Sequence, residues 1–207
     1  MTKKKLKVNT RLEPLKVTCT TSDCGNDLHC FKATRKLRAS GQAGSCRSCG
    51  VELVDWDRVH KQDAQDADYT FEAMRHEFIR HYFWHVDIDE KAFLHALRKG
   101  RSAFDEAVTK RIRQSVGKAQ PVRDGLQTPF TGNIIFYAQH ATASCCRTCM
   151  EYWHGIPTGV PLTDEQVEYF SKLALLFIDE RLPDLPLKGQ RIPKRKIDDP
   201  ETKGGGQ

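Results

Sequence analysis

Residues 102–116 read SAFDEAVTKRIRQSV. Within this stretch an apolar residue recurs at every fourth position, at Phe104, Val108, Ile112 and Val116. Apolar side chains at this interval fall on one face of an α-helix, so the stretch predicts an amphipathic helix with a buried face. Ser102 is a typical N-cap residue, and Pro121 closes the segment.

Helical signals continue on both sides of this stretch. Upstream, the spacing of Phe71, Met74, Phe78 and Tyr82 predicts one helix over about residues 70–86. A second helix is expected over 90–99, with Asp87 or Asp89 as its cap and Gly100 as its end.

Downstream, the apolar run at 134–137 predicts either a buried strand or the start of a helix, and the composition of 141–153 suits a helix. Thr163 and Gln166 form a capping box that begins a last amphipathic helix, which Pro183 ends.

The overall composition is that of a polar globular protein. The chain has 207 residues, a formal net charge of +6 and 29% charged residues, so it has room for one domain and a small module. No run approaches 18 consecutive apolar residues, which argues against a transmembrane helix, and no apolar segment follows the Lys-rich start as in a secretory signal. We therefore expect a cytoplasmic protein with no membrane contact.

The eight cysteines fall in two tight groups, which favours metal binding in a reducing compartment over a disulfide framework. The first group is Cys19-x4-Cys24-Gly and Cys46-x2-Cys49-Gly. Two halves that each end in Cys-Gly predict a zinc ribbon-like module with four thiolates around one structural zinc ion. Cys30, between the halves, is interpreted as a small buried hydrophobe, with ligation by Cys30 or His29 as the alternative.

The second group is His140-Ala-Thr-Ala-Ser-Cys145-Cys146-Arg-Thr-Cys149, followed by His154. On a helix the three thiols would share one face, with His140 or His154 as the fourth ligand. Zinc is the first choice for this site and an iron–sulfur cluster the second, with Cys30 as one remote ligand to consider. A redox-active thiol pair is the third alternative.

These segments predict an α+β fold, in which a small zinc ribbon-like β module precedes a mainly α-helical domain. The expected divisions are a basic flexible arm (1–16), the zinc module (17–56), the helical domain with the Cys/His motif (70–183) and a disordered basic tail (184–207).

The motif from Gln127-Thr-Pro through Gln139-His-Ala-Thr-Ala-Ser-Cys-Cys-Arg-x-Cys to Trp153-His-Gly-Ile-Pro resembles a bacterial family, domain-of-unknown-function family 4186. The resemblance spans about residues 70–182 and excludes the N-terminal cysteine module. It implies a small, mostly helical cytoplasmic protein, and it carries no established activity.

Three functions are compatible with these features. The first is a nucleic-acid-binding module with structural metal, in which cations contact phosphates: Lys3–Lys7, Lys32, Arg35, Lys36, Arg38, Arg98, Arg101 and Lys110–Arg113. The second is docking to a protein partner. The alternative is a metal-dependent hydrolase, nuclease or redox enzyme that uses the site at 140–154. The sequence fixes neither the oligomeric state nor whether the two cysteine groups lie close in space.

Overall fold

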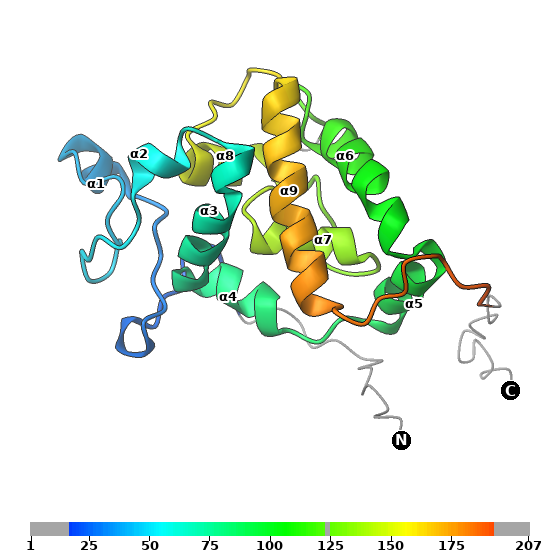
Figure 1. Cartoon of the computed structure of the whole chain (residues 1–207). Coiled ribbons are helices and arrows are strands. Elements are labelled where there is room, and N and C mark those ends of the chain that lie inside the picture. The colour runs from blue at the N-terminus through cyan, green and yellow to red at the C-terminus, as the bar shows by residue number, and fades with distance from the viewer. Residues whose placement is uncertain (1–16, 123–124, 193–207) are drawn as a thin grey trace, which may run out of the picture.

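The computed structural model describes residues 17–122 and 125–192, and its regular structure is helical (Figure 1). The α-helices are α1 (Arg35–Ala39), α2 (Trp56–Val59), α3 (Ala67–Ala73), α4 (Phe78–His85), α5 (Glu90–Lys99), α6 (Phe104–Ser115), α7 (Ile134–Ala141), α8 (Arg147–His154) and α9 (Asp164–Arg181). The described ranges contain no β-strand, and only two isolated bridges pair residues in a β-like manner, Asp23 with Leu28 and His29 with Glu77.

The prediction of an α+β fold with a β ribbon was therefore wrong. The segment between the two halves of the first cysteine group forms α1, because the Thr34 side chain accepts a hydrogen bond from the Leu37 N–H and caps the helix. The backbone of His29 pairs with the helical domain instead of with a hairpin partner: its N–H donates to the His76 carbonyl (2.7 Å), and its carbonyl accepts from the Phe78 N–H (2.9 Å).

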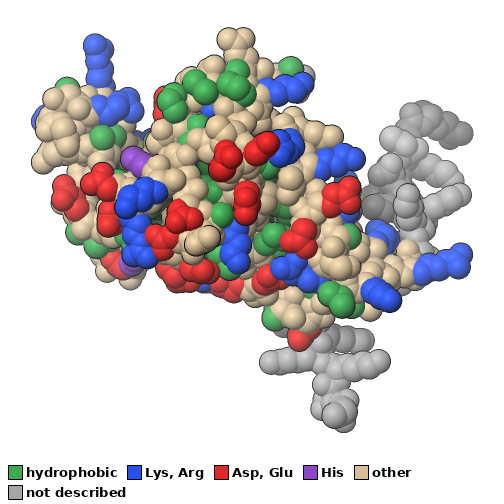
Figure 2. Space-filling view, turned by 45° about the horizontal axis from the view of Figure 1, so that its top comes forward, with side chains coloured by type: hydrophobic (Ala, Val, Ile, Leu, Met, Phe, Trp, Pro, Cys, Tyr) green, Lys and Arg blue, Asp and Glu red, His purple; other side chains and the backbone are tan. Residues whose placement is uncertain are grey.

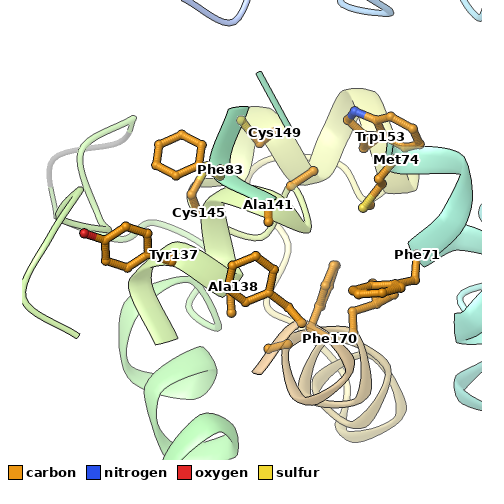
Figure 3. Packing of buried hydrophobic residues seen from close by; sticks show 14 of the residues in the cluster. Phe71, Met74, Phe83, Tyr137, Ala138, Ala141, Cys145, Cys149, Trp153 and Phe170 are labelled. Carbon is orange, nitrogen blue, oxygen red and sulfur yellow. The ribbon is translucent and has the colours of Figure 1, made fainter. Parts of the chain in front are cut away.

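The core of the helical domain surrounds α7. Every residue of α7 except Phe136 is buried, and α4 and α9 pack against it. Figure 3 shows Ala138 and Ala141 of this helix facing Phe83, Met74 and Phe170 from the neighbouring helices. Small residues on α7 let the aromatic side chains of α4 and α9 approach closely, which fixes the position of the segment that follows α7.

Three predicted helices are confirmed. α5 begins at the Asp89 cap, whose carboxylate accepts from the Ala92 N–H, and ends at Gly100 with φ 73°. α6 buries its four-residue repeat, but Ser102 does not cap it, because the helix begins after Ala103 and the Ser102 hydroxyl donates to the Leu187 carbonyl. α9 begins with the predicted capping box of Thr163 and Gln166. The run at 134–137 proves to be the start of a helix.

Two predicted helices are interrupted. The helix expected over 70–86 breaks at Glu77, whose backbone is extended (ψ 124°) because this residue pairs with the His29 strand-like segment. The helix expected over 141–153 breaks at 142–146, where Ala143 takes a positive φ of 51°. The Thr142 hydroxyl donates to the Ala138 carbonyl (2.7 Å) and ends α7 before the cysteines.

The N-terminal segment, which comprises residues 17–66 before α3, packs on the helical domain through aromatic side chains. Phe31 lies edge-on to Trp153 of α8 and to Trp56 of α2, with ring centroids 5.8 and 5.7 Å apart. Gln62 donates to the carbonyl of His154 (2.7 Å) and accepts from Gln166 of α9 (2.8 Å). The segment is therefore docked on the domain, beside α8.

The predicted basic arm (1–16) and most of the predicted tail (184–207) lie outside the described residues. Residues 184–192 are described, and their backbone bonds to the end of α5 and the turn after it. The Pro186 and Leu187 carbonyls accept from Arg101 and Ser102, and the Gln190 N–H donates to Leu97.

Candidate metal centres

The first cluster of ligand atoms consists of Cys24, His29, Cys46 and Cys49, which lie within 4.8 Å of one another. The Cys24 and Cys46 sulfurs are 3.8 Å apart, and the Cys49 sulfur is 3.5 Å from Nδ1 of His29. With Zn–S near 2.3 Å and Zn–N near 2.0–2.1 Å, a tetrahedral ion separates two sulfurs by about 3.8 Å and a sulfur and a nitrogen by about 3.6 Å. These two distances therefore match those around a single tetrahedral zinc ion, and all four atoms lie close enough to bind one ion together.

A neighbouring carboxylate orients His29 for this role. Nε2 of His29 is 3.0 Å from Asp27, which leaves Nδ1 with its lone pair facing the three sulfurs. Asp27 also lies 3.1 Å from Nδ1 of His76 in the helical domain. The same carboxylate thus links the cluster to the surface on which the N-terminal segment docks.

Backbone N–H groups surround the Cys46 sulfur, as in a metal knuckle. The Ser48 N–H donates to it over 3.5 Å, and the N–H groups of Cys30 and Cys49 point at it as well. Burial raises the pKa of this thiol, but the three N–H donors and His29 outweigh burial and lower it to about 6. Gly50 follows with φ 80°, a conformation that glycine adopts without strain.

This set differs from the four cysteines that the sequence predicted. His29 takes the place of Cys19, which the spacing of the motif had paired with Cys24. Cys30 is fully buried, and its thiol donates to the carbonyl of Cys19 (3.3 Å). From the sequence, His29 was only an alternative ligand, and the signal that favours it is Asp27 two residues earlier, because a carboxylate bonded to a histidine is typical of zinc sites.

The second cluster consists of Cys145, Cys146 and Cys149, whose sulfurs also lie within 4.8 Å of one another. Cys145 and Cys146 are in the turn before α8, Cys146 is the N-cap residue of α8, and Cys149 is in its first turn. All three are buried. Contacts among the three thiols, together with burial, raise the pKa of each of them, so the thiols are protonated at neutral pH until an ion binds.

A buried ion pair lies beside the second cluster. The Arg80 guanidinium donates to Glu77 (2.9 Å), to the Tyr152 hydroxyl (2.7 Å) and to the Cys149 sulfur (3.4 Å), and it also reaches the His140 carbonyl. Glu77 accepts in addition from Tyr152 (3.1 Å) and from the Trp153 indole. Both charged side chains are 1% exposed. A charge so deeply buried requires partners, and the cluster is one of them.

His140 and His154, the predicted fourth ligands, are held away from the three sulfurs by other contacts. His140 is stacked between Phe83 and Phe130, and its Nε2 lies 3.3 Å from the Thr128 and Pro129 carbonyls. His154 contacts the Tyr169 hydroxyl (3.2 Å) and the Thr142 carbonyl (3.1 Å). Burial lowers the pKa of His140 to about 4 and that of His154 to about 3, so both imidazoles are neutral at neutral pH.

Other residues of the motif that contains the second cluster stabilise the turn before α8. Gln139 donates to the Ser144 carbonyl (3.1 Å) and accepts from Arg111 (3.1 Å). Arg147 donates to the carbonyls of Val116, Pro157 and Val160 and so fastens the neighbouring loops. Thr128 donates to the Cys145 carbonyl (2.8 Å).

The predicted phosphate-binding cations separate into two groups. Lys3–Lys7 lie outside the described residues. Arg101 pairs with Asp179, Arg113 with Asp164, and Arg98 donates to the Ile192 carbonyl. Arg35, Lys36 and Arg38 are exposed on α1, Lys32 is half-buried before it, and none of these four forms an ion pair with a described residue. Figure 2 shows basic side chains projecting at the upper left, over the N-terminal segment.

The fold and the two clusters together define a helical protein with two separate groups of side chains that can hold a metal ion. The first group contains three cysteines and one histidine, and the second contains three cysteines. The family described as "Domain of unknown function (DUF4186)" matches residues 68–179, which is more than half of the chain. The chain therefore belongs to that family, and the second cluster lies inside the matched region, whereas the first precedes it.

No solved structure matches this chain. Among the described residues, none of the helices combines the length and apolarity that crossing a membrane would require.

Proposed function

We propose that this protein binds zinc at Cys24, His29, Cys46 and Cys49, and that the ion fixes the N-terminal segment on the helical domain. The single observation that carries the proposal is the agreement of the sulfur–sulfur and sulfur–nitrogen distances with a tetrahedral zinc ion. Three thiolates and one imidazole form a closed coordination shell, so the role of the ion is structural. Asp27 supports this role by bonding both to a ligand and to His76.

Zinc content tests this proposal directly. Full-length protein purified without oxygen is expected to lose one zinc ion per chain on Cys46→Ser, because three ligands hold the ion far more weakly than four. Cys30→Ala is the matched control, since Cys30 is an equally buried thiol nearby that belongs to neither cluster. Plasma mass spectrometry together with a protein assay gives the number of zinc ions per chain. An unchanged zinc ratio in Cys46→Ser would exclude this ligand set.

We further propose that the zinc-fixed segment presents α1 to nucleic acid. The supporting observation is that Arg35, Lys36 and Arg38 are exposed on one short helix without a described carboxylate partner, whereas Arg101 and Arg113 are paired. Phosphate contacts by such cations would release counterions and make the binding depend on salt.

The triple change Arg35→Ala, Lys36→Ala and Arg38→Ala is expected to weaken binding to a labelled RNA or DNA oligonucleotide. The slope of log affinity against log salt should fall by about 2–3, because each lost phosphate contact contributes about 0.7–0.9. Lys91→Ala, Lys118→Ala and Lys172→Ala remove the same charge from exposed positions elsewhere and serve as control. Equal effects of both triples, or no binding by the wild type, would exclude a site on α1.

The enzyme alternative finds less support. It requires His140 or His154 beside the thiols, and both are held by other partners. The cavities of about 740, 500 and 290 Å³ in the described part of the molecule lie along α3, α5, α6 and α9, and none of these three is lined by a cysteine.

A further inference from the structure

The second cluster offers three thiols, and its group of ligand atoms within 4.8 Å of one another contains no fourth ligand. Its sulfurs are close enough for one metal ion, but a closed tetrahedral site needs a fourth donor. The two histidines of the motif are occupied by carbonyl, hydroxyl and ring contacts. The completing ligand must therefore come from a different part of the chain.

Cys19 is placed to be that ligand. Its thiol interacts with the Cys149 thiol, although 130 residues separate the two along the chain. The Cys19 sulfur lies outside the group of three that are all within 4.8 Å of one another, so a metal ion must draw it closer to Cys145 and Cys146. Its backbone is held in place because its carbonyl accepts from the Cys30 thiol (3.3 Å). Cys19 is only five residues before Cys24, so the N-terminal segment passes from one cluster to the other within a single turn of chain.

Charge supports a site of four thiolates here. Four thiolates and one divalent ion leave a net charge of −2, which is costly to bury without nearby cations. Arg80 donates to the Cys149 sulfur, so a charged donor faces the site, although Glu77 balances the charge of Arg80 itself. Arg80 in turn is fixed by Glu77 and Tyr152, so its guanidinium is oriented before a metal binds.

The spacing of the sulfurs selects the class of metal. One ion bound directly by thiolates needs sulfurs about 3.8 Å apart, and the three sulfurs of the cluster lie within 4.8 Å of one another. An iron–sulfur cluster places a core of several atoms between its thiolates, which would force these sulfurs farther apart. A single soft divalent ion fits the spacing better.

We propose that Cys19 joins Cys145, Cys146 and Cys149 as the fourth thiolate of a second metal centre, which takes one zinc ion. Binding releases the four thiol protons and leaves the ion bonded to four sulfurs. The centre joins the N-terminal segment to α8 by direct bonds. It goes beyond the function proposed above, which concerns the first cluster and different ligands.

Counting zinc in single and double variants tests the assignment. The wild-type chain is expected to hold two zinc ions, and Cys19→Ser and Cys149→Ser are each expected to hold one. The double variant Cys19→Ser/Cys149→Ser should also hold one, because both changes affect the same ion. Cys19→Ser/Cys46→Ser should hold none. One ion remaining in this last variant would mean that Cys19 is a ligand of the first centre, and the proposal would be wrong.

Cobalt provides a second readout that does not depend on how a variant folds. Wild-type protein loaded with Co²⁺ should bind two equivalents, and both should give the intense visible bands of tetrahedral cobalt with thiolate ligands. If the wild type binds a single equivalent, Cys46→Ser identifies the missing centre. No cobalt in Cys46→Ser would overturn the second centre, whereas one equivalent in Cys46→Ser would mean that the first centre is the one that fails. If the freshly purified protein contains iron and shows a broad band in its visible spectrum, the site holds an iron–sulfur cluster instead of zinc, and the proposal is wrong.

Discussion

Replacement of Arg80 by Met is expected to destabilise the protein by about 3–5 kcal/mol, because it leaves the Glu77 carboxylate buried without its cation. The two side chains are each 1% exposed, and Glu77 keeps only the neutral donors Tyr152 and Trp153 after the change. The Cys149 sulfur loses a charged donor at the same time. Urea unfolding at neutral pH with saturating zinc measures the loss.

Arg75→Met is the matched control for this experiment. Arg75 lies five residues earlier and pairs with Glu72 and Glu180, but its side chain is 31% exposed and its partners are 64% and 40% exposed. Exposed ion pairs contribute between about 0 and 1 kcal/mol, and the contact of Arg75 with the Trp84 ring adds a similar amount. Arg75→Met should therefore cost less than half as much as Arg80→Met.

The double variant Glu77→Gln/Arg80→Met separates the ion pair from the packing of the arginine stem. Removal of both charges should recover part of the loss, since no uncompensated charge remains buried. A loss in Arg80→Met no larger than in Arg75→Met, or a double variant as unstable as the sum of its singles, would contradict the role assigned to this pair.

Removal of zinc from the first centre is expected to release the segment from Cys24 to Gly50. Structural zinc contributes about 10–16 kcal/mol of binding free energy in small zinc-binding peptides, which exceeds what the ring contacts of Phe31 and the backbone hydrogen bonds of His29 supply. The amides of this segment should exchange with deuterium at least about 100-fold faster after treatment with a strong chelator, which removes zinc from both proposed centres, and a variant of a first-centre ligand isolates the first. Amides of α6 and α9 should be unchanged, because those helices are held by the apolar core.

Cys49→Ser should reproduce this effect without a chelator, and Ser48→Ala is its control in the same loop. Ser48 contacts Ser22 through its hydroxyl and is not a ligand of the cluster. Unchanged protection of Cys24–Gly50 in Cys49→Ser would show that the aromatic contacts of Phe31 alone hold the segment in place.

The sequence predicted the helices that depend on local signals. α5, α6 and α9 have a capping residue, a regular apolar repeat or both, and each was predicted close to its bounds. The breaks at Glu77 and at 142–146 depend on contacts distant in sequence. Glu77 is extended because it meets His29, 48 residues earlier, and no periodicity around Glu77 reports that contact.

The candidate metal ligands, like the helices, could be predicted only where the signal is local in the sequence. The spacing of Cys46 and Cys49 identified a knuckle, and the three thiols at 145–149 were recognised as a cluster. Motif spacing grouped Cys19 with Cys24, whereas the cluster of ligand atoms around Cys24 contains His29 and not Cys19. The β ribbon failed as a prediction because the sequence between the knuckles forms α1, and because the backbone of His29 bonds to the helical domain.

Zinc X-ray absorption on the Cys149→Ser variant, which is expected to retain only the first centre, tests the central claim most directly. Three sulfur neighbours at about 2.3 Å and one nitrogen at about 2.0–2.1 Å are expected, as Cys24, Cys46, Cys49 and His29 would supply. Four sulfur neighbours and no nitrogen would contradict it, because a cysteine such as Cys19 would then occupy the place that the structure gives to His29.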